Sequence, residues 1–168
     1  MPTSTMLAPV VVELNRQFNQ ELAAAHHYLA ISLWCEAQNF SGCAAFFAKQ
    51  ASEEREHAGK LIKHLLHRGQ SPLVAALPAP RTAYGSLLDV ALQAQALEVE
   101  NSRGIHAAYE AALDAKDYPA QVLLHWFINE QVEEEAWCAN LVARVQGALC
   151  AGSLASLDSH VEKLLASE

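Results

Sequence analysis

The sequence predicts an all-α protein: a bundle of four long helices with one long crossover and a short fifth helix. Just over half of its 168 residues are apolar, and alanine, which loses the least side-chain entropy in a helix, is abundant. Apolar residues recur every three or four positions on both sides of residues 69–85, a stretch that holds three prolines and two glycines. The chain is long enough for one full hydrophobic core, so we expect a single domain over residues 1–168.

Two helices are expected before that stretch, over about residues 5–38 and 41–68. The first carries one apolar stripe, whose members are Leu14, Phe18, Ala25, Leu29 and Ser32. Ser41 has a side chain that suits a helix N-cap, so it is expected to open the second helix. Gly69 is expected to end that helix, because glycine readily adopts the left-handed conformation that follows many last turns.

Two more long helices are expected after the stretch, over about residues 86–116 and 119–145. Ser86 and the acid three positions later resemble a capping box, which opens the third helix. The Asp-Tyr-Pro run at residues 117–119 is expected to begin the fourth helix, and Pro119 falls in its first turn, where the missing N–H is tolerated.

A short final helix is expected over about residues 153–166, with Ser153 as its cap. Its apolar side is formed by Leu154, Leu157, Val161, Leu164 and Leu165. A helix of this length is not stable alone. The apolar side is therefore expected to dock on the bundle or on a neighbouring chain.

The segment of residues 69–85 decides the topology of the bundle. A helix of about 27 residues is roughly 40 Å long, and an extended link of about 16 residues reaches roughly 50 Å. The link can therefore run the whole length of the bundle and leave the second and third helices parallel. The other connections are short and imply antiparallel neighbours.

Charge and targeting signals argue against several classes of function. The formal net charge is −8, which argues against binding to nucleic acid and fits a solvated surface or an affinity for cations. No signal-peptide pattern opens the chain, and no apolar stretch approaches a membrane span. The four cysteines form no CxxC pair and are interpreted as small apolar fillers in a reducing compartment. We therefore expect a cytoplasmic protein with no nucleic-acid or membrane partner.

Each of the four long helices places an acid on its inward stripe. The polar residues on these stripes are Glu21 and Tyr28 on the first helix, Glu54 and His57 on the second, Glu98 on the third, and Glu130 and Glu134 on the fourth, with Gln131 and Glu133 close by. No lysine or arginine lies on the same stripes. An unpaired buried carboxylate is costly or takes up a proton, and several close together raise one another's pKa.

A bound divalent cation resolves this conflict, because it cancels the charge and uses the carboxylate lone pairs. Carboxylate oxygens with one imidazole nitrogen suit iron or manganese and can also hold zinc. Two metals fit better than one, since Glu54 has two oxygens and a central place from which to bridge. A lone Glu-x-x-His is usually a solvated helix face, so the prediction depends on the conjunction of inward acids with the crossover.

At these residues the sequence resembles a bacterial non-haem ferritin of the ferritin-like di-iron family, over nearly the whole chain. One long crossover among four helices is also the ferritin-like arrangement. The segments that carry the resemblance are residues 19–22, 53–57, 117–119 and 126–135. The last of them contains a Glu-Gln-x-Glu-Glu-Glu signature that is quite specific.

The resemblance implies a role for each inward polar residue. The residues implied to hold the first iron are Glu21, Glu54 and His57. Glu54 would bridge to a second iron held by Glu98 and Glu134, with Gln131 beside the pair and Tyr28 hydrogen-bonded near it. The residues that match the family's third iron site are Glu53, Glu130, Glu133 and Glu134. Glu98 is preferred to Glu100 because of its distance from the Asp-Tyr-Pro run and its place on the inward stripe.

Ferritins of this kind assemble as hollow shells of twenty-four chains, oxidise Fe(II) with oxygen or peroxide, and deposit a ferric mineral inside. The resemblance thus implies a homo-oligomeric ferroxidase and iron-storage protein, whose final helix lines four-fold channels. Arg55 stands where bacterioferritins carry a haem-binding methionine, so no haem is expected. Gln131 and Glu134 stand where symmetric di-iron enzymes carry a second Glu-x-x-His, so the second metal position should be the weaker one.

Two other functions remain open. A ferritin-like di-iron redox enzyme would consume peroxide or oxygen without storing mineral. A non-catalytic helical interaction module, whose acids are merely solvated, would bind no metal tightly.

Overall fold

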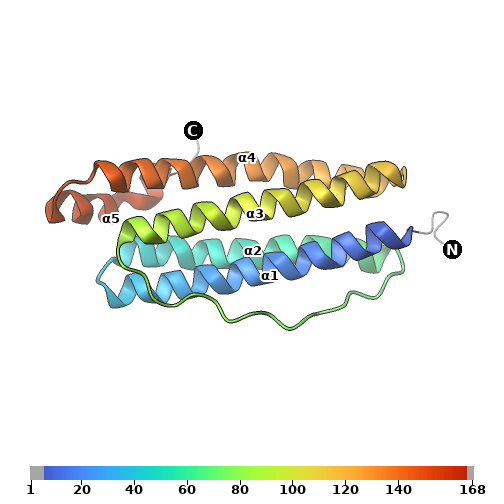
Figure 1. Cartoon of the computed structure of the whole chain (residues 1–168), viewed down its shortest axis with the longest axis horizontal. Coiled ribbons are helices and arrows are strands. Elements are labelled where there is room, and N and C mark those ends of the chain that lie inside the picture. The colour runs from blue at the N-terminus through green and yellow to red at the C-terminus, as the bar shows by residue number, and fades with distance from the viewer. Residues whose placement is uncertain (1–5, 166–168) are drawn as a thin grey trace.

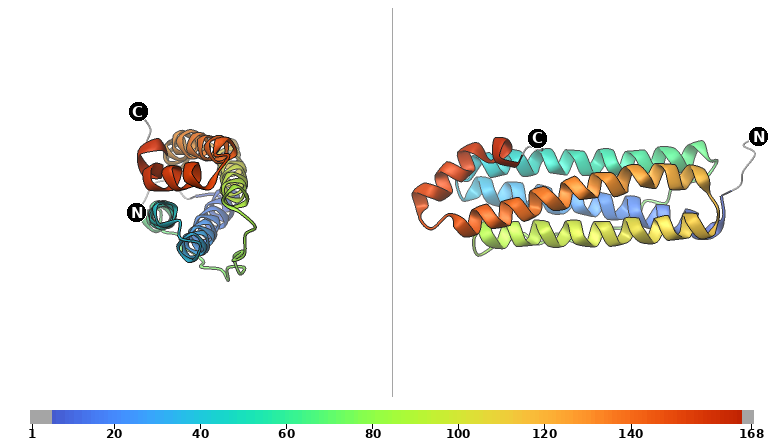
Figure 2. Two further views of the ribbon diagram at one scale, coloured as in Figure 1. Left: turned by 90° about the vertical axis from the view of Figure 1, so that its left-hand side faces the viewer. Right: turned by 90° about the horizontal axis from the view of Figure 1, so that it is seen from above.

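The computed structural model describes residues 6–165, and these residues form five helices and no strand. The helices are α1 (Ala8–Ala37), α2 (Ser41–His67), α3 (Leu87–Asp114), α4 (Tyr118–Gly147) and α5 (Ala151–Leu165). The four long helices lie side by side as a bundle, and α5 folds back at one end of it (Figure 1, Figure 2). The predicted all-α fold, with four long helices and a short fifth, is confirmed.

The crossover sets the directions of the helices. Residues 69–85 contain no helix and run along the outside of the bundle from the end of α2 to the start of α3 (Figure 1). As a result α2 and α3 run parallel, while the pairs joined by short turns run antiparallel. Two asparagines of α1 hold the link: Asn15 Oδ1 accepts the N–H of Leu73 at 2.8 Å, and Asn19 Oδ1 accepts the N–H of Ala75 at 2.8 Å.

Several helix ends follow the local signals in the sequence. Gly69 ends α2 with φ at 73°, in the left-handed region that favours glycine. Ser86 Oγ accepts the N–H of Asp89 at 3.1 Å and so caps α3. The Asp89 carboxylate accepts from the N–H of Gly85 instead of Ser86, so the capping box is only half formed. Asp117 caps α4 by accepting the N–H of Ala120 at 3.2 Å.

The start of α2 differs from the expectation. Ser41 is the first helical residue and not the cap, and the capping position makes no side-chain hydrogen bond. The first N–H groups of α2 are satisfied by another helix, because the Asp158 carboxylate of α5 accepts from Gly42 at 3.1 Å and from Cys43 at 2.8 Å. Glycine at 42 permits this approach, since a Cβ there would lie 1.9 Å from the carbonyl oxygen of Asp158.

Three further expectations need correction. Ser153 is not the cap of α5: the helix begins at Ala151, and Ser153 Oγ reaches back to accept the N–H of Cys150 at 3.1 Å. Leu29 is 39% exposed, because the buried stripe of α1 passes through Tyr28 instead. The first helix begins at Ala8, after the non-helical residues 6 and 7, and the proline at its start lies in the first turn. Residues 5 and 166, the expected outer limits of the first and last helices, lie outside the described residues.

The core consists of two apolar clusters with a polar layer between them. One cluster includes Phe47, Val90 and Leu141 and lies toward the α5 end of the bundle. The other includes Leu14 and Ile105 and lies toward the opposite end. Every long helix passes from one cluster to the other through buried polar side chains. No helix within residues 6–165 is both long enough and apolar enough to cross a bilayer.

Replacing Asp158 with alanine is expected to lower the free energy of unfolding by about 1–2 kcal/mol, because two N–H groups of α2 lose their acceptor. Chemical denaturation at a fixed protein concentration measures the change. Ser159→Ala is the matched control, since the hydroxyl of Ser159 bonds only to a carbonyl of its own helix. Equal stabilities of the two variants would show that Asp158 does not anchor α5.

Candidate metal centre

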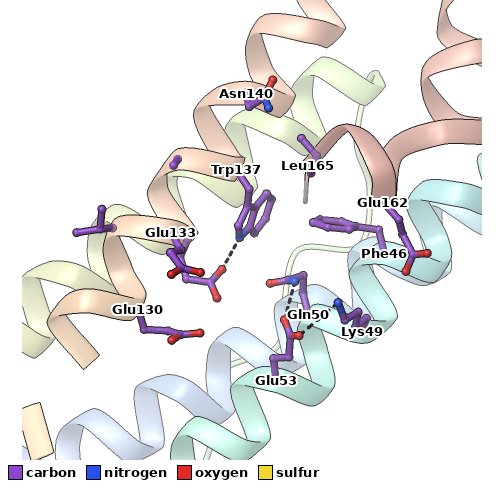
Figure 3. Close-up of a pocket in the computed structure, with 13 residues that line it drawn as sticks. Phe46, Lys49, Gln50, Glu53, Glu130, Glu133, Trp137, Asn140, Glu162 and Leu165 are labelled. Carbon is purple, nitrogen blue, oxygen red and sulfur yellow. Dashed lines mark hydrogen bonds and ion pairs between the residues drawn. The ribbon is translucent and has the colours of Figure 1, made fainter. Parts of the chain in front are cut away.

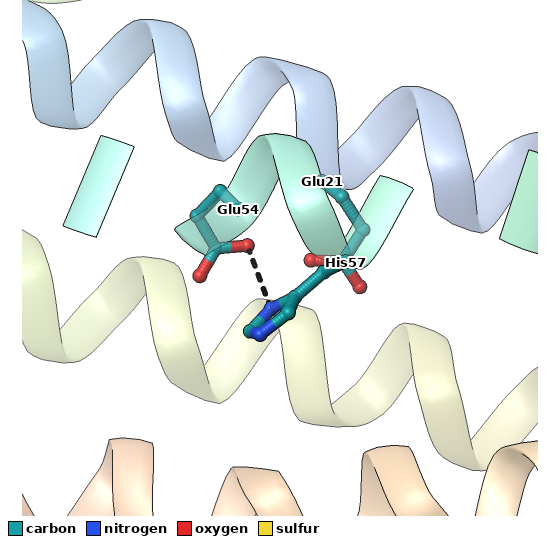
Figure 4. Close-up of side chains that lie close together, drawn as sticks. All are labelled: Glu21, Glu54 and His57. Carbon is teal, nitrogen blue, oxygen red and sulfur yellow. Dashed lines mark ion pairs between the residues drawn. The ribbon is translucent and has the colours of Figure 1, made fainter. Parts of the chain in front are cut away.

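The polar layer is formed by side chains from all four long helices. Among them Glu21, Glu54 and Glu98 are fully buried, and His57 and Glu134 are no more than 5% exposed. Each lies on the inward face of its helix, where the apolar spacing would otherwise place a leucine or valine. Figure 4 shows Glu54 and His57 on successive turns of α2, with Glu21 of α1 facing them.

Three sets of side chains bring ligand atoms together, with all atoms of a set within 4.8 Å of one another. The first position is formed by Glu21, Glu54 and His57, the second by Glu54, Glu98 and Glu134, and the outer position by His57, Glu130 and Glu134. Glu54 belongs to the first two sets, so its carboxylate lies between them. Within residues 6–165, Glu53 and Glu133 belong to none of the sets.

Glu54 is the residue whose surroundings most need a cation. Both of its carboxylate oxygens are buried, and neither has a hydrogen-bond partner. Burial, followed by the nearby charge of Glu21, raises the pKa of Glu54 well above its ordinary value. Metal ions at the two positions would use lone pairs on both oxygens of Glu54 and offset the cost of desolvating them. The donor set therefore fits a pair of divalent cations.

The other carboxylates are held by hydrogen bonds. Tyr28 donates its hydroxyl proton to Glu98 Oε1, and Gln131 Nε2 donates to Glu98 Oε2 at 3.1 Å. Trp137 Nε1 donates to Glu134 Oε2. These donors fix the orientation of the ligands before any metal arrives, as the groups around metal ligands commonly do.

Burial sets the charge of the layer. It raises the pKa of Glu98 to about 7, although the hydrogen bonds from Tyr28 and Gln131 act in the opposite direction. It raises the pKa of Glu134 to about 8, with the nearby charge of Glu98 adding to the effect. These carboxyl groups therefore hold protons near neutral pH unless a cation replaces them.

His57 lies between the first and the outer positions. Its Nδ1 is 3.6 Å from Glu54 Oε2, and its Nε2 is 3.9 Å from Glu130 Oε1. Burial lowers the pKa of His57, which favours the neutral imidazole that binds metals. A neutral ring offers one nitrogen lone pair at a time, so His57 could bind a metal at only one of the two positions at once.

A cavity of about 550 Å³ adjoins the outer position, between α2, α4 and α5. Its polar wall is formed by Lys49, Gln50, Glu53, Glu130, Glu133, Glu134, Asn140 and Glu162. Figure 3 shows carboxylates of α2 and α4 facing this space, with the Trp137 ring on one side of it. Gln50 Nε2 donates to Glu53 Oε2 at 2.7 Å, and Lys49 Nζ lies 3.6 Å from Glu53 Oε1.

Three further polar residues of the layer, which were not predicted from the sequence, hydrogen-bond to the candidate ligands. Gln17 and Asn101 donate to Glu21, and Trp137 donates to Glu134. Sequence spacing could have identified two of them, because Gln17 lies four positions before Glu21 and Trp137 three positions after Glu134, on the same helix faces. Asn101 bonds to an acid of a different helix, so no spacing within one helix reveals it.

A crossover four-helix bundle with carboxylates and one histidine at its centre defines a ferritin-like protein. The chain belongs to the ferritin family, because the family's model, described as a ferritin-like domain, matches residues 11–148.

Known relatives agree with this assignment. A bacterial non-heme ferritin from Staphylococcus saprophyticus is 38% identical over 123 residues, which is 73% of this chain and 74% of the relative. One from Staphylococcus aureus is 38% identical over 132 residues, or 78% of this chain and 80% of the relative. An open-pore ferritin of the archaeon Archaeoglobus fulgidus has a similar structure, with a TM-score of 0.91 and 27% identity over 98% of this chain and 100% of its own.

Proposed function

We propose that this protein is a ferroxidase that oxidises Fe(II) to Fe(III) at a di-iron site within each chain and stores the product as a ferric mineral. The observation that carries the proposal is the Glu54 carboxylate, which is buried without a donor and shared by two ligand sets. Membership of the ferritin family and the relatives called non-heme ferritins support iron as the metal.

In the proposed reaction the two irons are substrates. One Fe(II) binds to Glu21, Glu54 and His57, and the other to Glu54, Glu98 and Glu134. Each iron gives one electron to oxygen or peroxide, and Glu54 holds the two metals close enough to react with one oxidant. Tyr28 and Gln131 keep Glu98 oriented, and the high pKa of the Tyr28 phenol, raised by burial, keeps its hydroxyl a donor. Protons held by Glu98 and Glu134 leave as the metals bind.

The ferric product is proposed to leave toward the cavity between α2, α4 and α5. The outer position shares His57 with the first position and Glu134 with the second, so it can accept an iron from either one. The further carboxylates proposed for a third iron site here are Glu53, Glu130 and Glu133, and all three line the cavity. Successive carboxylates suit a trivalent iron ion, because negatively charged oxygen atoms are good ligands for a cation of high charge.

The storage function requires a closed assembly, so we propose a homo-oligomeric shell of twenty-four chains in the cytoplasm. A single bundle encloses no space large enough for a mineral. Large apolar side chains lie exposed on α1 and α4, including Leu33 at 64% and Val122 at 71%, and they are available for contacts between subunits. The thiols within residues 6–165 are all unpaired, which agrees with a reducing compartment.

Aerobic addition of Fe(II) to the metal-free protein tests the function. We expect oxidation, followed by near-ultraviolet absorbance, to be much faster than in buffer, and hundreds of irons to co-elute with a very large assembly on a sizing column. Rapid oxidation with only the iron of the buried positions retained would exclude storage and favour a di-iron redox enzyme. A rate equal to that of buffer would exclude the ferroxidase itself.

A further inference from the structure

Two amide side chains enclose the carboxylate of Glu21 in a closed hydrogen-bonded ring. Gln17 Nε2 donates to Glu21 Oε1 at 2.8 Å and to Asn101 Oδ1 at 2.7 Å. Asn101 Nδ2 donates to Glu21 Oε2 at 2.9 Å. Each oxygen of Glu21 therefore accepts one N–H, and both amides are almost fully buried, with Gln17 at 0% and Asn101 at 1% exposure.

The packing of α1 against α3 fixes the amide of Gln17. A Cβ at Gly104 would lie 2.4 Å from Gln17 Oε1, so any larger residue at this position would displace the amide. The main chain of Gly104 is also held, because its carbonyl oxygen accepts a hydrogen bond from Arg16 Nη2 at 2.6 Å. Gln17 Oε1 has no partner of its own. Exchanging its oxygen and nitrogen would set the oxygen against two acceptors, so the amide has one possible orientation.

Neutral amides hold Glu21 without changing the charge of the first position. A lysine or arginine in their place would cancel the charge that attracts a cation, and a further acid would add to the repulsion. Because both donors are amides, neither brings a positive charge beside Glu21 to compete with a bound cation. One lone pair on each Glu21 oxygen is used by an amide, and the others remain for the metal.

We propose that Gln17 and Asn101 are positioning residues that hold Glu21 in its metal-binding orientation and thereby strengthen the binding of divalent metal at the first position. The proposal rests on the di-iron function above. It explains how the first position is prepared before metal arrives: Glu21 is fixed, while Glu54 has no donor and remains free to bridge. Metal binding then orders fewer side chains and is stronger for that reason.

Anaerobic titration of the metal-free protein with Co²⁺ tests the proposal, with visible absorption and calorimetry as readouts. In Gln17→Met and Asn101→Ser the affinity of the first binding phase is expected to fall about tenfold to a hundredfold. The second phase, which reports Glu98 and Glu134, is expected to keep its affinity in Gln17→Met. Asn101 also acts on Glu98, so Asn101→Ser can weaken both phases. A loss confined to one phase distinguishes positioning from a general structural effect.

Gln20→Met is the matched control. Gln20 is the same residue type on the same helix and also lies against Gly104, but its Nε2 donates to the carbonyl of Glu100 and to no ligand. Its titration is expected to match that of the parent, and sizing chromatography verifies the assembly of each variant. If Gln17→Met and Asn101→Ser both bind Co²⁺ as the parent does, the positioning role is wrong and the di-iron function is unaffected. If the parent itself binds no Co²⁺, the metal centre is wrong.

Discussion

Glu54→Gln is expected to make the metal-free protein more stable and, at the same time, to abolish rapid Fe(II) oxidation. The stability effect follows from the surroundings of the carboxylate, which has no hydrogen-bond partner at either oxygen. The raised pKa means that folding must either bury the Glu54 charge or protonate the acid, and both cost free energy. A glutamine amide of the same size is neutral without a proton, and its N–H groups can donate hydrogen bonds to the acids around it. We expect a gain of about 1–3 kcal/mol in the free energy of unfolding at neutral pH.

The activity effect follows from the position of Glu54 between the two ligand sets. A neutral amide cannot bridge two cations as a carboxylate does, so both positions lose affinity together. The initial rate of Fe(II) oxidation is expected to fall at least about tenfold. The increase in thermal midpoint that Zn²⁺ produces in the parent should largely disappear.

Glu56→Gln is the control for both measurements, because Glu56 lies two positions further along α2 and is exposed. Its stability, oxidation rate and response to Zn²⁺ are expected to equal those of the parent. If the metal-free Glu54→Gln protein were less stable than the parent, the Glu54 carboxyl would have to make a stabilising interaction in the folded protein without metal. An unchanged oxidation rate would place the ferroxidase site elsewhere.

The overall fold could be predicted because its signals are local. The prolines and glycines between residues 69 and 85 give the length of the crossover, and Asp117 and Ser86 act on N–H groups within their own helices. The cap of α2 could not be predicted in this way. Its acceptor is Asp158, which is more than one hundred residues away in the sequence, and folding alone brings it to Gly42.

The residues of the candidate site could likewise be predicted only in part. An acid on an apolar stripe conflicts with burial, so Glu21, Glu54 and Glu98 could be singled out from spacing and charge. Buried amides such as Asn101 create no such conflict, because an amide on a helix is equally compatible with a solvated face. Their role depends on which helices are neighbours and at what height, which the packing of α1 against α3 determines.

The pH dependence of stability is expected to be steeper for the metal-free protein than for the metal-bound protein. Burial raises the pKa of Glu98 to about 7 and that of Glu134 to about 8, whereas both groups ionise near 4.5 in the unfolded chain. Between these values the folded protein holds protons that the unfolded chain has released. The free energy of unfolding therefore falls as pH rises toward the folded-state pKa values, and it levels off above them.

Between pH 6.5 and 8.5 the metal-free protein should thus lose stability, by about 2–3 kcal/mol from Glu98 and Glu134 alone. Burial lowers the pKa of His57, so His57 acts in the opposite direction only below this range, where the unfolded chain would still hold its proton. Metal binding displaces the carboxyl protons, so the stabilisation by a fixed excess of Zn²⁺ should grow over the same range. Thermal midpoints of the metal-free and Zn²⁺-loaded protein at several pH values measure both trends.

Glu134→Gln removes the contribution of Glu134 to this effect, because the amide has no proton to lose. The metal-free variant is expected to show a shallower decline with pH, most clearly between pH 7 and 8.5. Glu162→Gln serves as the control, since Glu162 lines the same cavity but is exposed, and it should decline as the parent does. If the metal-free parent instead gained stability between pH 6.5 and 8.5, the carboxyls of the layer would be ionised and paired in the absence of metal. The physical reason for two bound cations would then be lost.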